Sequence, residues 1–123
     1  MPKHDLIQSS NDADDDDYEA AERYLELIKD EKTAAQLVKA LRKAKPRRYC
    51  AKDVLRASGL PLLDVNNAQV QKDMEKIRAG KQQAPLLLVR DPAQSKVIVA
   101  DGFHRLCAAY VFNEEAELSC KVV

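Results

Sequence analysis

The chain has 123 residues, which is enough for one domain with a modest hydrophobic core. Its 20 basic and 20 acidic residues cancel, so net charge provides no general attraction to nucleic acid or to a membrane surface. With no apolar run of about 18 residues, no signal-peptide pattern and only three widely spaced cysteines, we expect a cytoplasmic protein with reduced thiols, no membrane contact and no metal ligands.

The first 17 residues form an acidic leader. Five aspartates crowd its second half, at positions Asp12, Asp14, Asp15, Asp16 and Asp17. A metal-binding loop is the alternative, but the carboxylates lack the alternating spacing and the glycine of a calcium loop. We therefore expect residues 1–17 to be disordered, with His4 playing no role, and the last acids to favour the N-terminus of the next helix.

Residues 18–45 predict a pair of antiparallel helices. Ala21, Tyr24, Leu25 and Ile28 recur at spacings of three and four, and a second apolar stripe precedes Pro46. A helical pair with one apolar face must pack on something. That is either the downstream domain or a second copy of the chain, so a homodimer formed through these helices is one of the two alternatives.

A basic segment overlaps the end of this pair. Its cations are Lys39, Arg42, Lys43, Lys45, Arg47, Arg48, Lys52 and Arg56. It is either a nucleic-acid footprint, which the missing helix-turn-helix and aromatics disfavour, or a solvated helix end. A third alternative is that Lys52 or Arg56 turns inward toward the site discussed below.

Residues 46–123 predict a small mixed sheet with packed helices, an α+β fold. The pattern indicates a strand and short helix ending at Gly59, then a helix that buries Val70, Met74 and Ile77. Two apolar runs, Leu86–Val89 and Val97–Ala100, flank a proline-containing turn and predict adjacent central strands. The last residues, 118–123, alternate as a closing strand.

The candidate site is the corner formed by Asp101, Gly102, Phe103, His104 and Arg105. It joins the strand Val97–Ala100 to a helix, whose first backbone N–H groups are unpaired and favour an anion. Arg105 in the first turn suits a phosphate. The plainer alternatives are that Asp101 only caps the helix and that the His104 ring bonds a nearby backbone carbonyl.

This corner resembles the signature of the ParB/sulfiredoxin superfamily, over roughly residues 49–123. Gly102, Arg105 and Ala108 match the Gly-x-x-Arg-x-x-Ala box of partition proteins. His104 adds a match to the Gly-Cys-His-Arg of sulfiredoxins, and Asp101 to the Asp-Gly-x-x-Arg of free serine kinases. The resemblance implies a nucleotide phosphate, of ATP, ADP or CTP and with or without magnesium, held at the helix N-terminus.

Departures from each branch narrow the expected function. Phe103 stands where sulfiredoxins carry cysteine, and Cys107 lies a helical turn further on, where we expect it to be packed. No DNA-reading helix-turn-helix follows the domain. We therefore expect a stand-alone nucleotide-binding protein with a regulatory or interaction role. The alternatives are a DNA-associated accessory protein, and a small phosphotransferase or nucleotide hydrolase with Asp64, Asp73 or Glu75 as the candidate base.

Overall fold

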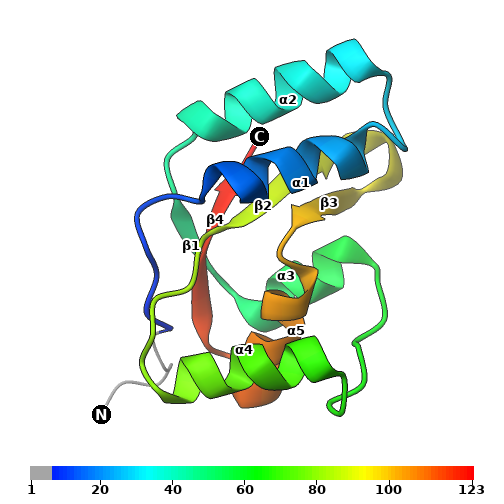
Figure 1. The fold of residues 1–123 in the computed structure, drawn as a ribbon. Helices are drawn as coiled ribbons and strands as arrows, with labels where there is room; N and C mark the ends of the chain where they lie inside the picture. Colours follow the sequence, from blue (N-terminus) through cyan, green and yellow to red (C-terminus); the bar gives the residue numbers. More distant parts are fainter. Residues whose placement is uncertain (1–6) are drawn as a thin grey trace.

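The computed structural model describes residues 7–123, and over these it contains five α-helices and a four-stranded sheet (Figure 1). In chain order the elements are α1 (Asp15–Leu25), α2 (Glu31–Lys43), β1 (Arg47–Cys50), α3 (Ala51–Ser58), α4 (Ala68–Arg78), β2 (Leu86–Asp91), the short 3-10 helix η1 (Pro92–Gln94), β3 (Lys96–Asp101), α5 (Phe103–Phe112) and β4 (Glu117–Val122). The expected α+β fold, with two helices preceding a mixed sheet, is confirmed.

The sheet has the strand order β1-β4-β2-β3. The closing strand β4 inserts between β1, to which it is antiparallel, and β2, to which it is parallel. β2 and β3 pair antiparallel through the expected turn, so their adjacency is confirmed. The expectation that both are central is wrong for β3, which lies at the end of the sheet because β4 takes the inner position beside β2.

Helices cover both faces of the sheet. α1 and α2 pack on one face, where their apolar residues meet Leu87, Val89 and Ala100. α3, α4 and α5 pack on the other, against Leu88 and Val99 (Figure 1). Ala21 and Leu25 of the predicted stripe therefore pack on the downstream sheet of the same chain, whereas Tyr24 and Ile28 of that stripe stay exposed, because α1 ends at Leu25.

The acidic leader differs from its expected form. Residues 1–6, with His4, lie outside the described residues, but α1 already begins at Asp15. Ile7 is 3 % exposed, and Ser10 N donates to Gln83 O at 3.0 Å. The expected disordered segment up to residue 17 is thus corrected for residues 7–17, because Ile7 supplies an apolar anchor and the aspartates find partners.

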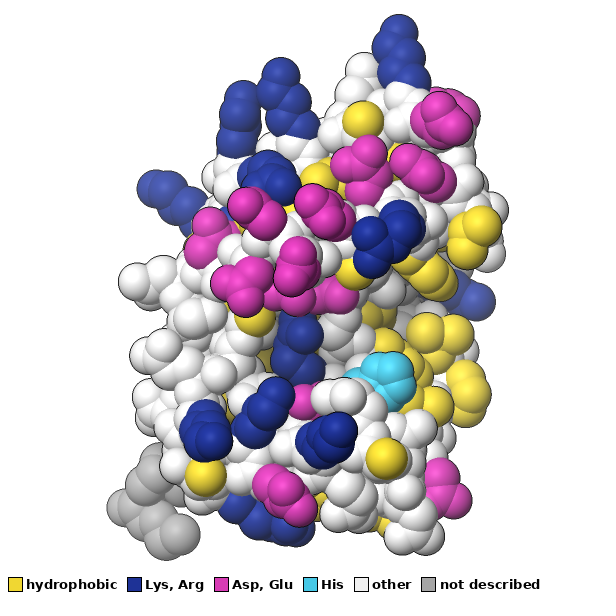
Figure 2. Space-filling view, in the orientation of Figure 1, with side chains coloured by type: hydrophobic (Ala, Val, Ile, Leu, Met, Phe, Trp, Pro, Cys, Tyr) yellow, Lys and Arg dark blue, Asp and Glu magenta, His cyan; other side chains and the backbone are white. Residues whose placement is uncertain are grey.

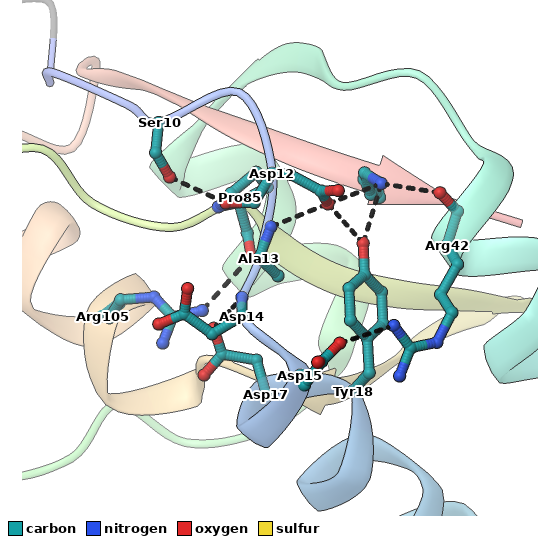
Figure 3. A network of polar contacts seen from close by, with 11 residues as sticks. Ser10, Asp12, Ala13, Asp14, Asp15, Asp17, Tyr18, Arg42, Pro85 and Arg105 are labelled. Atoms are coloured by element: carbon teal, nitrogen blue, oxygen red, sulfur yellow. Dashed lines mark hydrogen bonds and ion pairs between the residues drawn. The ribbon is translucent and has the colours of Figure 1, made fainter.

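The main partner is Lys121 of the central strand β4, whose side chain is 3 % exposed. Its Nζ donates to Tyr18 Oη at 2.8 Å and to Arg42 O at 3.1 Å, and lies 2.8 Å from Asp12 Oδ1 (Figure 3). The hydrogen bonds from Lys121 and Tyr18 lower the pKa of Asp12 to about 2. We call Asp12, Tyr18 and Lys121 the clasp, since they fasten the N-terminal segment to the sheet.

No helix among the described residues is long and apolar enough to cross a membrane.

Candidate functional site

A polar cleft of about 490 Å³ lies where α4, the start of α1 and the β3–α5 corner meet. Its lining side chains are Asp14, Asp17, Gln69, Asp73, Lys76, Gln82, Gln83, Ala84, Asp101, Gly102, His104 and Arg105. Acidic side chains over α1 face cationic side chains over α4 across the hollow (Figure 2). Three segments far apart in the chain therefore build one site.

The corner has the geometry that the sequence predicts. Gly102 adopts φ 102° and precedes α5 with no side-chain cap, and the first backbone bond of the helix runs from Leu106 N to Gly102 O at 3.0 Å. The N–H groups of the first turn therefore have no partner within the helix. A Cβ at position 102 would lie 2.5 Å from Leu86 Cδ2 and 2.8 Å from Arg105 Nη2, so only glycine fits this approach.

Arg105 reaches into the cleft from α5 and is 19 % exposed. Its Nη2 donates to Pro85 O at 3.2 Å (Figure 3). The same nitrogen donates to Asp101 Oδ2 at 3.3 Å. Its Nε is buried and has no acceptor among the described residues. These internal contacts hold the guanidinium in place, while donors remain on the same group.

The N-cap of α5 is Gly102, and Asp101, which precedes it, pairs with Arg105 one turn along. Burial raises the pKa of Asp101, an effect that the charge of Arg105 opposes. The capping alternative is therefore wrong, and Asp101 orients Arg105.

The other two corner residues point to different places. His104 is exposed and lines the cleft. Phe103 is half-buried and packs against the core under α3, α4 and α5, so its side chain does not line the cleft. The structure therefore brings together Asp101, Gly102, His104 and Arg105, whereas Phe103 contributes only backbone at this corner.

Several cleft residues were not singled out for the site from the sequence. Asp73 was weighed only as a candidate base; it is 3 % exposed on α4 and accepts a hydrogen bond from Gln69 Nε2 at 3.2 Å. Lys76 follows one turn later on the same helix. Their spacing of three residues, with Gln69 four before Asp73, is a signal for a shared polar face. No sequence pattern around Asp14 and Asp17 indicates that they line the cleft. They reach it only because α1 packs beside β3.

Carboxylates outnumber cations in this cleft. The cleft is lined by two cationic side chains, Lys76 and Arg105, and by four carboxylates, Asp14, Asp17, Asp73 and Asp101. Among residues 7–123, no three or more His, Cys, Asp or Glu side chains are grouped so that they alone could hold a metal ion. A bare anion would meet repulsion here, whereas an anion accompanied by a cation would not.

The basic segment does not supply further cations to the cleft. Lys52 pairs with Glu115, and neither Lys52 nor Arg56 lines the cleft, so the inward-turning alternative is wrong. Arg42 pairs with Asp15 at 2.9 Å and stacks over the Tyr18 ring, and Arg48 donates to two backbone carbonyls. Part of the segment therefore stabilises the fold.

The thiols are packed, as expected for Cys107. Cys107 and Cys120 are buried, and burial raises the pKa of both, to about 12 for Cys120. A thiolate at either position is disfavoured at neutral pH.

Comparison with known proteins finds no matching family model, no matching curated protein and no matching solved structure.

Proposed function

We propose that the cleft binds the phosphate groups of a nucleotide at the N-terminus of α5. The observation that carries this proposal is the position of the Arg105 guanidinium, fixed by Asp101 and Pro85 beside the unpaired first-turn N–H groups. The Nε of Arg105 is a buried donor without an acceptor, which costs free energy. A ligand oxygen that accepted its hydrogen bond would remove that cost. The resemblance to the ParB/sulfiredoxin superfamily supports the same ligand class, ATP, ADP or CTP.

The acidic surroundings favour a nucleotide that arrives with magnesium. Mg²⁺ keeps most of its water and commonly uses one or two protein carboxylates together with substrate phosphates. One or two carboxylates from among Asp14, Asp17 and Asp101 at the cleft would meet that need, whereas these charges would repel a free phosphate. The carboxylates would then neutralise the cation, while Arg105 and Lys76 contact the phosphates.

We further propose a regulatory or interaction role in the cytoplasm. Nucleoside triphosphates and reduced thiols are both found there, and all three cysteines of the chain are free. Ligand binding that bridges α1, α4 and α5 would couple the nucleotide to the position of the N-terminal segment.

Calorimetric titration against ATP, ADP and CTP tests the binding proposal. We expect saturable binding with magnesium and at least about tenfold weaker binding when EDTA removes it. Lys76→Ala should weaken binding about fivefold, since Lys76 is exposed and contributes about 1 kcal/mol. Arg78→Ala, an exposed cation of α4 that does not line the cleft, is the matched control and should change nothing.

Arg105→Ala should reduce affinity about ten- to hundredfold, the range of a charge-assisted hydrogen bond. It also strips Asp101 of its ion pair, so the unfolding midpoint of this variant must be measured alongside. Arg105→Lys should recover part of the affinity, because an ammonium cannot reproduce the guanidinium fork. Failure of the wild type to bind any of the three nucleotides refutes the proposal.

A phosphotransferase is the second candidate, and one observation favours it. Of the three carboxylates considered as a base, only Asp73 lines the cleft. Asp64 instead accepts the backbone N–H of Asn66, and Glu75 lies on another face of α4. If Asp73 takes a proton from a substrate hydroxyl, Asp73→Asn should abolish ADP release from ATP with L-serine present, while nucleotide binding persists. Wild type without any ADP release excludes this candidate and leaves a binding protein.

A further inference from the structure

The two edge strands of the sheet, β1 and β3, differ in how well they are protected against pairing with a further strand. β1 is only four residues long and carries Arg47 and Arg48. β3 has six residues, and its four inner positions, Val97–Ala100, are all apolar. Among the described residues β3 pairs only with β2, so its outer backbone groups are open to a further strand. Natural proteins avoid long apolar edges of this kind unless the edge has a partner.

Apolar side chains line both sides of this open edge. A groove of about 220 Å³ runs along β3, with Tyr24 and Ile28 from the end of α1 on one side and Leu60 on the other. Every large apolar side chain exposed in residues 7–123 belongs to these two flanking segments: Tyr24, Leu27, Ile28, Leu60, Leu62 and Val65. Figure 2 shows apolar side chains gathered at the right side of the molecule, the side on which Figure 1 places β3 and the α3–α4 loop.

The ends of β3 carry opposite charges, with Lys96 at its start and Asp101 at its end. In an antiparallel pair of two such strands, the positive end of each lies beside the negative end of the other. A parallel pair would instead set like charges side by side. Because Asp101 is already paired with Arg105 at 3.3 Å, charge at this edge acts chiefly against a parallel pair, in which the exposed Lys96 side chains of the two copies would lie side by side.

We propose that a second copy of the chain occupies this edge, with β3 paired to β3 antiparallel about a two-fold axis. The same surface then serves both subunits, and the flanking apolar side chains of each copy meet those of the other. The sheet continues across the dimer. The buried apolar residues of α1 and α2, such as Leu25 and Leu41, take no part, because the sheet of their own chain covers them.

This pairing also bears on the cleft. β3 ends at Asp101, where the cleft begins, so the antiparallel arrangement sets Lys96 of the partner subunit beside that corner. It would add a cation to a cleft in which carboxylates are in excess. The pairing itself rests on the edge and its flanks, and not on nucleotide binding.

Sedimentation equilibrium of the full chain at micromolar concentration tests the proposal, and the expected species is a dimer. Val97→Lys places two like charges in the pairing, and Leu27→Asp charges a side chain that is 83 % exposed and has no role in the core. Each should weaken the dimer about tenfold or more. Ala35→Asp, which adds the same charge to the exposed side of α2, should leave it unchanged.

Cross-linking supplies a second measurement that does not depend on Val97→Lys folding. In a symmetric antiparallel pair one residue near the middle of β3 lies opposite its own copy, with Cα atoms about 4.5–5.5 Å apart. That separation permits a disulfide. In a Cys50→Ser background, at least one of Val97→Cys, Ile98→Cys and Val99→Cys should form an oxidised dimer. A wild type that stays monomeric, a dimer that survives both charged variants, or a monomer that instead takes an extended peptide along β3 overturns the proposal.

Discussion

Asp12→Asn removes the carboxylate charge that faces the buried ammonium of Lys121, while keeping an oxygen in nearly the same place. The ammonium retains its bonds to Tyr18 Oη and Arg42 O, so the loss is that of one ion pair at 2.8 Å. The lowering of the Asp12 pKa from 3.8 to about 2 corresponds to at most about 2.5 kcal/mol. Because the Asp12 side chain is 59 % exposed, solvent screening reduces the expected loss to about 1 kcal/mol.

The loss of unfolding free energy in Asp12→Asn should become smaller as the pH falls. A carboxyl group whose pKa is lowered by folding stabilises the folded state above its unfolded pKa and loses that contribution as the pH falls toward its folded pKa. For Asp12 this window runs from about pH 4 down to about 2. The free-energy difference between wild type and Asp12→Asn should therefore be constant from pH 7 to 5 and about half as large at pH 3.

Urea unfolding of both proteins at pH 7, 5 and 3, followed by far-ultraviolet circular dichroism, measures this difference. Asp16→Asn is the matched control, since Asp16 lies exposed in the same acidic run, in the first turn of α1. It should differ little from wild type at any of these pH values. An Asp12→Asn protein as stable as wild type at pH 7, or a difference that persists undiminished at pH 3, would refute the clasp.

Two further predictions concern packing. Gly102→Ala should lower the free energy of unfolding by roughly 2–4 kcal/mol and impair nucleotide binding, because the new Cβ would lie 2.5 Å from Leu86 Cδ2. Gly80→Ala, at a similar positive φ but with no atom within 4 Å of the new Cβ, should lower it by only about 1 kcal/mol. Equal losses of stability for the two variants in thermal unfolding would contradict this. In thiol labelling of the native chain, half-buried Cys50 should react first, whereas Cys107 and Cys120 should react only on unfolding; early labelling of either buried thiol would show that the core opens locally.

Local patterns predicted most of the secondary structure. The stripe of Val70, Met74 and Ile77 is buried on α4, and Gly59 ends α3 in the left-handed conformation that a helix C-terminus often needs. The predicted strand, turn and helix around Gly102 are also present, as β3, Gly102 and α5. Each of these features depends on residues within a few positions of one another, which is why periodicity and glycine placement suffice to find them.

The order of the strands and the charge of the cleft could not be predicted in this way. β4 lies inside the sheet although it comes last in the chain, and its Lys121, which stands between Cys120 and Val122 in the sequence, is buried. No pattern within β4 marks Lys121 as the partner of Asp12, more than a hundred residues earlier. Likewise the aspartates of the leader, solvated as an isolated segment, become part of a site only when α1 packs beside β3.

The ion pair of Arg105 with Asp101 is compatible with the proposed phosphate binding. Both internal bonds of the guanidinium are made by one nitrogen, Nη2, at 3.2 and 3.3 Å. A guanidinium has five N–H donors, so the others can bind a ligand without breaking the internal pair. Asp101 and Pro85 thus hold Arg105 in one orientation, which would reduce the entropy lost if the proposed ligand binds. What Asp101 does change is the net charge at the corner, and this is the reason to expect a nucleotide that arrives with magnesium rather than a free anion.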